Sequence, residues 1–310
     1  MVVGMGNVAL DVVRILAKPP DQLANTDIAD YALRQLRASK VREIWVLGRR
    51  GPAQAAFDAK ELADIAELDG VDVFLDGEVS LAEPAQLDPH EHVHIQRNLQ
   101  FLATLPRAPR ASAERRVRLR FLAAPKALIG EGGRVSAIDI EQNQLVEAPN
   151  GNVEAKGTGR VQRLSTGLVV RSIGYRATPI NGLPFDAQRS LIPNHGGMVG
   201  LAGEPIARCY VVGWIKRGPV GLLGTNKQDA KETVEAMLGG IPEALAGRPS
   251  RTPGSLANLL EQRGARVLSY SDWQRIDERE RERGAAHGKI REKFASVASL
   301  LDAAEKGPAA

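Results

Sequence analysis

The stretch VVGMGNVAL at residues 2–10 decides the fold of this chain. Two valines run into Gly4 and Gly6, and the helix-compatible segment 7–17 follows, so the sequence predicts a strand, a tight turn and a helix. Gly4 permits the sharp turn, Gly6 lets a pyrophosphate approach the backbone, and small Ala9 allows helix and strand to pack closely. The helix amino terminus offers free N–H groups and a positive dipole end to phosphate. The pattern predicts the phosphate-binding half of a dinucleotide-binding fold.

Taken alone, this motif also fits an ordinary strand-to-helix turn. The segment VREIWVL at residues 41–47 is apolar, ends before a glycine and predicts the next parallel strand. An NAD-specific site places Asp or Glu after this strand, whereas this chain has Arg49 and Arg50. Guanidinium groups match a phosphate in charge and geometry, so we predict that the pair binds the 2′-phosphate of NADP(H). The alternative interpretation is two solvated surface arginines.

The spacing between these two elements is unusual. About 40 residues separate the glycine turn from the arginines, compared with roughly 20 in a minimal unit. Pro19 and Pro20 break the first helix, and the segment 26–30 can cap a second one. The sequence therefore predicts an inserted helical hairpin.

Several further segments share one family pattern. They are GMGNVALD at 4–11, residues 21–30, GRRGP with QAAF at 48–57, KEL at 60–62 and VVGWIKRGP at 211–219. Together they resemble the adrenodoxin-reductase type of ferredoxin–NADP reductase, in the family's order, over most of residues 2–240. The resemblance implies an α/β fold with a Rossmann-like NADP-binding domain at 1–178. The carboxyl part of a second, FAD-binding Rossmann-like domain would follow at 179–247, and a charged helical tail at 248–310.

The resemblance also implies roles for single residues. Those that would hold NADPH are Gly4, Met5, Gly6, Asn7, Val8, Arg49, Arg50 and Glu61. Those that would lie against the flavin are Trp214, Gly221, Leu222 and Leu223, with Gly221 also near the nicotinamide. Asp11 matches an acidic family position near the cofactors, which predicts a catalytic role. The alternative for Asp11 is an acid at a helix start that the dipole favours.

By the same resemblance, the activity would be that of a flavin-dependent oxidoreductase that moves electrons from NADPH through FAD to a ferredoxin-type iron–sulfur protein. The printed sequence has no second G-x-G-x-x-G turn of the kind that binds FAD in this family. We therefore expect a fragment or truncated form without the amino-terminal FAD-binding segment, whose missing half a separate polypeptide could supply. The alternative is an NADPH-binding module without electron-transfer activity.

Composition narrows the class of protein. At 310 residues, the chain is long enough for two domains. Its one cysteine, Cys209, excludes a disulfide framework and lies in an apolar segment, which predicts a buried thiol. No apolar run is long enough to cross a bilayer, and we expect a cytoplasmic protein without a membrane span.

Charged and imidazole side chains suggest further sites. The net charge of +4 suits acidic partners, and arginines gather between residues 97 and 120, where they could steer an acidic electron carrier or form a solvated edge. No aromatic residues interleave with them, so we expect no nucleic-acid binding. His90, His92 and His94 alternate, which on a strand would place them on one face, but no fourth ligand is evident and we interpret them as exposed.

Alternating segments complete the outline. Residues 117–122 and 135–141 predict antiparallel strands around a glycine-rich turn at 130–133, and residues 168–175 predict a return to the parallel sheet. Helical periodicity at 255–263 and 273–283 predicts tail helices that pack on the enzyme, with Trp273 as the anchor.

Overall fold

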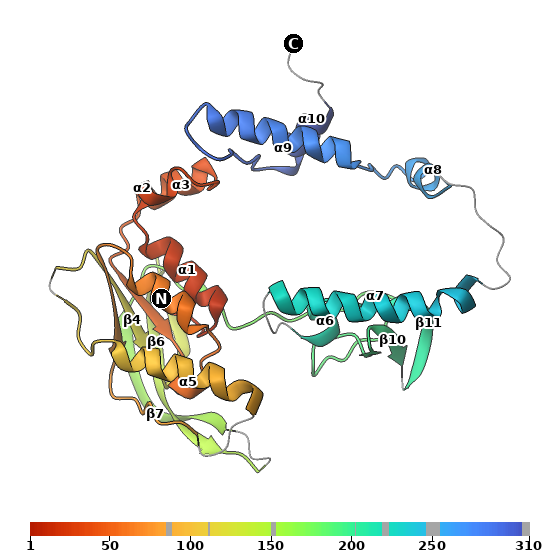
Figure 1. The fold of residues 1–310 in the computed structure, drawn as a ribbon. Coiled ribbons are helices and arrows are strands. Elements are labelled where there is room, and N and C mark those ends of the chain that lie inside the picture. The colour runs from red at the N-terminus through yellow and green to blue at the C-terminus, as the bar shows by residue number, and fades with distance from the viewer. Residues whose placement is uncertain are drawn as a thin grey trace. The chain divides into compact units, whose positions relative to one another are not determined.

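The computed structural model of the chain describes residues 1–84, 89–110, 112–149, 153–201, 203–218, 223–245 and 255–305. The chain divides into two units, Met1–Ile173 with Leu268–Ala310, and Gly174–Val267 (Figure 1). The domain division at 178 and 247 stays a prediction.

A five-stranded parallel sheet forms the centre of the first unit. Its strands, in spatial order, are β3 (Val71–Asp76), β4 (Arg115–Arg120), β2 (Glu43–Leu47), β1 (Val2–Val3) and β8 (Val170–Arg171). Val2 lies opposite Val46 on one side and Val170 on the other. The sheet extends to both sides of β1, with β2 on one side and β8 on the other. This order places a topological switch point at the carboxyl ends of β1 and β8, where open α/β sheets bind ligands.

Helices cover one face of this sheet (Figure 1). They are α1 (Asn7–Ala17), α4 (Ala59–Ala66) and α5 (Pro89–Thr104). Leu10 and Val13 of α1 and Leu62 of α4 are fully buried against Ile44 and Val46 of β2. This apolar layer fixes α1 directly behind the glycine turn, so that the helix begins at the switch point.

The predicted inserted hairpin is confirmed, and the N-cap of its second helix lies within the predicted segment 26–30. The hairpin consists of α2 (Pro20–Leu23) and α3 (Asp30–Arg37). Ala29 is the N-cap of α3 and makes no side-chain cap bond. Thr26 instead closes the preceding turn, because its hydroxyl donates to the carbonyl of Leu23 at 2.7 Å.

An antiparallel sheet covers the opposite face. Its strands are β5 (Ala123–Glu131), β6 (Arg134–Glu147) and β7 (Val153–Ser165). Ile138 and Ile140 of β6 pack on Leu47 and Trp45 of the parallel sheet. The predicted pairing of 117–122 with 135–141 is therefore wrong: residues 115–120 are a parallel strand between β2 and β3, and β5 pairs with β6.

The second unit is a small α/β arrangement. Its strands are β9 (Asn194–His195), β10 (Met198–Leu201) and β11 (Glu204–Tyr210), and its helices are α6 (Trp214–Arg217), α7 (Leu223–Leu245) and α8 (Ser255–Gln262). The predicted helix at 255–263 is confirmed as α8. Lys216 is 7% exposed, and its ammonium lies 3.0 Å from Asp229 and 2.8 Å from Glu232 of α7. The cation therefore holds α6 against α7.

Of the predicted tail, α8 belongs to the second unit, whereas residues 268–310 belong to the first. Helix α9 (Tyr270–Ala285) packs against α10 (Val297–Glu305) through Ile276 and Ala303. Lys289 forms an ion pair with Asp30, and Lys293 lies 2.8 Å from Asp27. Trp273, the predicted anchor, is 49% exposed and stacks on Tyr270. Ion pairs to the inserted hairpin, and not the tryptophan, attach the tail.

Candidate nucleotide-binding site

The glycine turn follows β1 directly. Gly4 has a φ of +133°, and its N–H donates to the carbonyl of Leu47 at 2.9 Å. A β-carbon at this position would lie 2.1 Å from the carbonyl oxygen of Ser172. Gly4 is therefore required by the fold itself, because both the backbone angle and the neighbouring chain after β8 exclude a side chain.

Gly6 differs from Gly4 in both respects. It is the N-cap of α1, with an extended backbone (φ −119°), and a β-carbon would meet nothing within 4 Å. The first turn of α1 has no acidic residue and Gly6 provides no side-chain cap, so no cap side chain takes up the first N–H groups of the helix. Neither backbone angle nor packing requires glycine here. The open cradle fits a diphosphate that approaches the backbone.

A loop holds this turn in place. The N–H of Ala56 donates to the carbonyl of Met5, and the N–H of Asp58 donates to Oδ1 of Asn7, both at 2.8 Å. Asn98 of α5 is 1% exposed and donates to the carbonyl of Phe57 at 2.8 Å. The side-chain amide oxygen of Asn7 therefore holds the loop at Asp58 in place, and Asn7 also belongs to the predicted site. Sequence reasoning missed Asn98.

The arginine pair follows β2. Both Arg49 and Arg50 are exposed, and within the described ranges neither forms an ion pair with a carboxylate. Their main chain is fixed: Nδ2 of Asn143 donates to the Arg49 carbonyl at 2.8 Å, and the N–H of Leu122 donates to the Arg50 carbonyl at 3.1 Å. The arrangement combines a held backbone with two uncommitted guanidinium groups, which is what phosphate binding requires.

Gly48, just before the arginines, contacts Met5 of the glycine turn. A β-carbon on Gly48 would lie 2.6 Å from Cγ of Met5. The two turns therefore pack directly on each other at the carboxyl ends of β1 and β2. The structure brings together the predicted residues from 4 to 8 and the arginines at 49 and 50.

Glu61 and Asp11 both contact the guanidinium group of Arg14. Arg14 of α1 pairs with Glu61 of α4, and its Nη1 lies 3.4 Å from Asp11. Asp11 occupies the second turn of α1, with a side chain that is 61% exposed, so the alternative of an acid in the first turn is wrong. A catalytic role of Asp11 and a cofactor contact of Glu61 stay predictions.

The predicted flavin side lies in the second unit. Trp214 is 41% exposed, and its ring lies 5.4 Å from that of Tyr175. Gly221 and Leu222 lie outside the described residues, as does the side chain of Leu223, the first residue of α7. Of the side chains predicted to lie against the flavin, the structure therefore describes that of Trp214, which forms an exposed aromatic pair with Tyr175. Cys209 is half-buried against the small core of this unit rather than fully buried.

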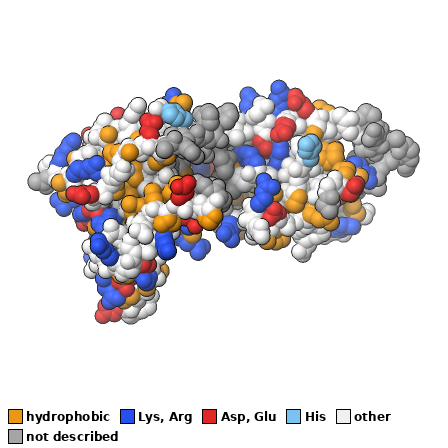
Figure 2. Space-filling view, turned by 90° about the horizontal axis from the view of Figure 1, so that it is seen from below, with side chains coloured by type: hydrophobic (Ala, Val, Ile, Leu, Met, Phe, Trp, Pro, Cys, Tyr) orange, Lys and Arg blue, Asp and Glu red, His pale blue; other side chains and the backbone are white. Residues whose placement is uncertain are grey.

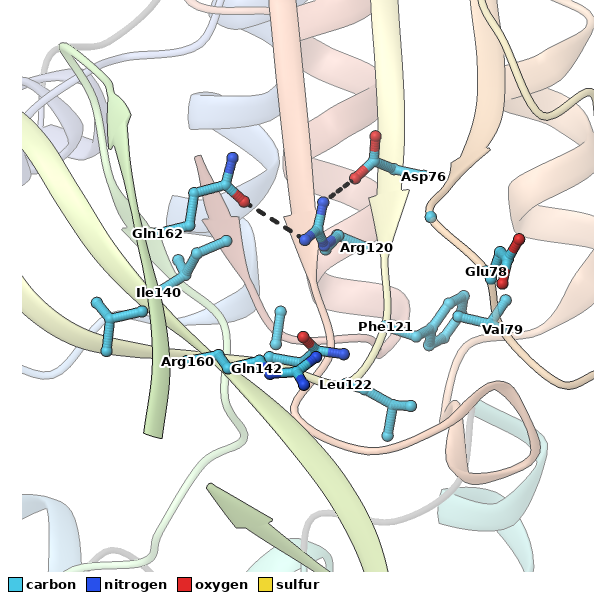
Figure 3. Close-up of a pocket in the computed structure, with 13 residues that line it drawn as sticks. Asp76, Glu78, Val79, Arg120, Phe121, Leu122, Ile140, Gln142, Arg160 and Gln162 are labelled. Atoms are coloured by element: carbon cyan, nitrogen blue, oxygen red, sulfur yellow. Dashed lines mark hydrogen bonds and ion pairs between the residues drawn. The ribbon is translucent and has the colours of Figure 1, made fainter. Parts of the chain in front are cut away.

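A cavity of about 360 Å³ opens at the carboxyl ends of β3 and β4, beside β6 and β7 (Figure 3). Arg120 forms an ion pair with Asp76 and donates to Gln162 at 3.4 Å. Glu78 and Arg160 also line the cavity, so its charges balance. The cavity therefore has no excess positive charge for a phosphate, unlike the arginine turn.

Four of the arginines from 97 to 120 bond to the fold through their guanidinium groups, namely Arg110, Arg115, Arg118 and Arg120. Arg118 pairs with Asp76 at 2.6 Å and with Glu43 at 2.7 Å, and its guanidinium lies over the rings of Trp45 and Phe74. On the face shown in Figure 2, Lys and Arg side chains lie among Asp and Glu side chains. The predicted steering surface therefore loses two of its arginines, Arg118 and Arg120, to internal ion pairs.

The histidines lie on a helix and not on a strand. His92 and His94 belong to α5, where residues two apart do not share a face. His94 lies 3.3 Å from Asn98, and the side chain of His90 is outside the described residues. Among the side chains that the structure describes, no cluster could hold a metal ion. No helix in the same part of the chain is long and apolar enough to span a membrane.

Known proteins show what the chain is similar to. It is 43% identical over 314 residues to the NADPH-ferredoxin reductase FprA of Mycobacterium tuberculosis, a match that covers 97% of this chain and 66% of that protein. It is 33% identical to the mitochondrial NADPH:adrenodoxin oxidoreductase of Arabidopsis thaliana, covering 98% of this chain and 66% of the relative. No protein-family model matches.

Solved structures agree. The structure of Mycobacterium tuberculosis FprA in complex with NADPH matches with a TM-score of 0.84 at 42% identity, covering 98% of this chain and 66% of that one. The chain thus spans about two thirds of the length of these relatives. The Rossmann-like α/β fold predicted from the sequence is confirmed.

Proposed function

Because the chain is homologous to NADPH–ferredoxin reductases along 97% of its length, we propose that it binds NADPH and works in a flavin-dependent oxidoreductase that passes electrons to a ferredoxin-type iron–sulfur protein. The relatives are named for this activity. The first step of the activity is the binding of NADPH, and the backbone turn and the arginine pair of this chain would suit its phosphate groups. The observation that carries the proposal is the open cradle at Gly6 beside the exposed pair Arg49 and Arg50.

The nucleotide half of the proposal rests on positioning. The amino terminus of α1 and the backbone at Gly6 would hold the diphosphate, and Arg49 with Arg50 would hold the 2′-phosphate. Two positive groups beyond β2, where an NAD enzyme has a carboxylate, favour NADPH over NADH. Met5, Asn7 and Val8 complete the cradle. Their task is to bind and orient the nucleotide, because positioning provides much of the catalysis in such enzymes.

The flavin half rests on less. When bound, NADPH supplies a hydride and FAD takes it up and returns single electrons to the iron–sulfur partner. Trp214 and Tyr175 form an exposed aromatic face that fits one side of a flavin ring. In this proposal, the contacts to the rest of FAD come from outside the described residues, either from a longer form of the chain or from a separate polypeptide.

The remaining assignments follow from the same proposal. The partner is an acidic iron–sulfur protein, which suits a chain with a net charge of +4. The proposed location is the cytoplasm. A chain with one cysteine cannot form a disulfide within itself, which suits a reducing compartment. The proposal also gives Asp11 a catalytic role and Glu61 a contact with the cofactor. Arg14, which both carboxylates contact, would hold the two side chains in position.

The test is a visible absorption spectrum of the purified chain after incubation with FAD and desalting, followed by addition of NADPH. A retained flavin band that bleaches with NADPH supports the oxidoreductase. If no flavin is retained but NADPH still binds, the chain is an NADPH-binding module that lacks electron transfer by itself. Failure to bind NADPH at all would overturn the proposal.

A further inference from the structure

The connection between β4 and β5 contains a strained residue. Leu122 has a φ of +52°, a conformation that a bulky side chain rarely adopts. Such strain persists only where the surroundings impose it, and it gathers at functional sites. Leu122 also lines the cavity at the ends of β3 and β4 (Figure 3). Neighbouring groups must therefore hold the backbone of Leu122 in this conformation.

Both polar backbone groups of Leu122 are bonded across the fold. Its N–H donates to the Arg50 carbonyl at 3.1 Å, and its carbonyl accepts the N–H of Asn143 at 2.7 Å. The side chain of Asn143 then donates to the Arg49 carbonyl at 2.8 Å. These three bonds form a closed clasp of Arg49–Arg50, Leu122 and Asn143. Each arginine has its main-chain carbonyl fixed, while its side chain stays exposed.

The antiparallel sheet is shaped to present Asn143. Its strand β6 pairs with β7 with a register shift between Glu141 and Asn143, and on β7 the hydroxyl of Thr158 donates to the Gln142 carbonyl at 2.8 Å. Such bulges re-aim a side chain near functional sites. Asn143 is 6% exposed, so its amide is committed to the protein interior and is not a surface group.

We infer that Asn143 is a positioning residue for nucleotide selectivity: through the clasp it sets the backbone from which Arg49 and Arg50 reach the 2′-phosphate. This inference rests on the proposed function. The two arginine side chains are long and flexible, so a fixed backbone reduces the ordering that phosphate binding costs. The three hydrogen bonds of the clasp reach the turn that distinguishes NADPH from NADH, and none of them involves Gly6 of the shared diphosphate cradle.

The test measures the dissociation constants of NADPH and NADH for wild type and Asn143→Leu, which keeps the size of the side chain but removes the donor. We expect the preference for NADPH to fall about tenfold, because the Arg49 carbonyl loses the donor that fixes its backbone. The affinity for NADH should change less than twofold. Asn143→Ala removes the donor without adding an apolar branch and should give the same shift, which covers the case in which the leucine variant does not fold.

Ser136→Ala is the matched control, because it deletes a side-chain-to-carbonyl hydrogen bond of the same sheet, to Ile129, that contacts neither the arginines nor Asn143. It should leave both dissociation constants unchanged. If wild type shows no preference for NADPH, the proposed function fails. If wild type prefers NADPH and both Asn143 variants keep that preference, or lose both nucleotides equally, the inference about Asn143 is overturned while the proposed function stands.

Discussion

Gly4 lies so close to Ser172 that a β-carbon on Gly4 would approach the serine carbonyl oxygen to 2.1 Å. This contact joins the end of β1 to the chain that follows β8, across the switch point of the sheet. A β-carbon added to Gly6, two residues further along, would meet nothing within 4 Å. The two glycines of one motif are therefore required for different reasons, and substitution can separate them.

Gly4→Ala should destabilise the protein. The alanine would overlap a backbone oxygen that cannot move without shifting β8, and it would adopt a φ of +133°. We expect a loss of about 2–4 kcal/mol in the free energy of unfolding, from overpacking and backbone strain together. Chemical denaturation followed by circular dichroism measures this loss, and a change within about 0.5 kcal/mol would contradict the assigned geometry.

Gly6→Ala should weaken nucleotide binding and leave stability almost unchanged. Alanine fits the extended backbone at residue 6 and meets no protein atom, but its methyl group occupies the open cradle. We expect NADPH and NADH to bind at least tenfold more weakly, about 1.4 kcal/mol, with unfolding within about 0.5 kcal/mol of wild type. Calorimetric titration with both nucleotides is the measurement. Unchanged binding would show that no ligand approaches this backbone.

Lys216→Met should destabilise the second unit in a pH-dependent way. Burial alone lowers the pKa of Lys216, but hydrogen bonds and charge from Glu232 and Asp229 outweigh it and raise that pKa. Burial raises the pKa of Asp229, yet the Gly213 N–H and Lys216 bring it below its ordinary value of 3.8. Removal of the cation leaves a buried carboxylate unpaired, which costs about 3 kcal/mol near neutral pH.

The pH dependence of this cost has a definite sign. The pair contributes fully above the ordinary Asp pKa and below the ordinary Lys pKa, and its contribution fades as pH falls through the lowered pKa of Asp229. The stability difference between wild type and Lys216→Met should therefore be constant from about pH 5 to 9 and shrink below about pH 4. Lys231→Met is the control, because its pair with Glu235 is exposed on α7. A difference that grows on acidification would refute the assignment.

Lys289→Met should detach the tail helices more than Lys293→Met does. The Lys289 side chain is 7% exposed and pairs with Asp30, whereas Lys293 and Asp27 are each 51% exposed. Each lysine holds the pKa of its aspartate below the ordinary value, so these attachments persist at neutral pH and weaken as pH falls below about 4. Hydrogen exchange of residues 270–285 reports attachment. Equal exchange in both variants would contradict this order.

The parts of the proposed nucleotide site that the sequence predicts are local ones. The glycine turn and the arginine pair each occupy one short segment after a strand, so spacing and residue type suffice to locate them. Asn98 and Asn143 could not be found in this way. They reach their targets across 41 and 94 residues of sequence, and neither forms part of a periodic pattern.

Two mispredicted segments have a common cause. The alternation of arginine and apolar residues in the predicted strand 117–122 indicates an antiparallel strand with one exposed face, but β4 is parallel and its arginine face is only partly exposed. Arg118 satisfies burial through Asp76 and the ring of Trp45, so its charge misled the assignment. The alternating histidines likewise suggested a strand, whereas burial of Ile95, Leu99 and Leu102 follows helical spacing in α5.

The most direct test of the account compares NADPH and NADH binding by wild type and the double variant Arg49→Ala/Arg50→Ala. The pair should contribute about 3 kcal/mol to NADPH binding through charge-assisted bonds to the 2′-phosphate and almost nothing to NADH. Arg42→Ala, an exposed arginine before the opposite end of β2, is the control for loss of positive charge. Only the double variant should lose its preference for NADPH. Equal losses for both nucleotides, or no loss for either, would contradict it.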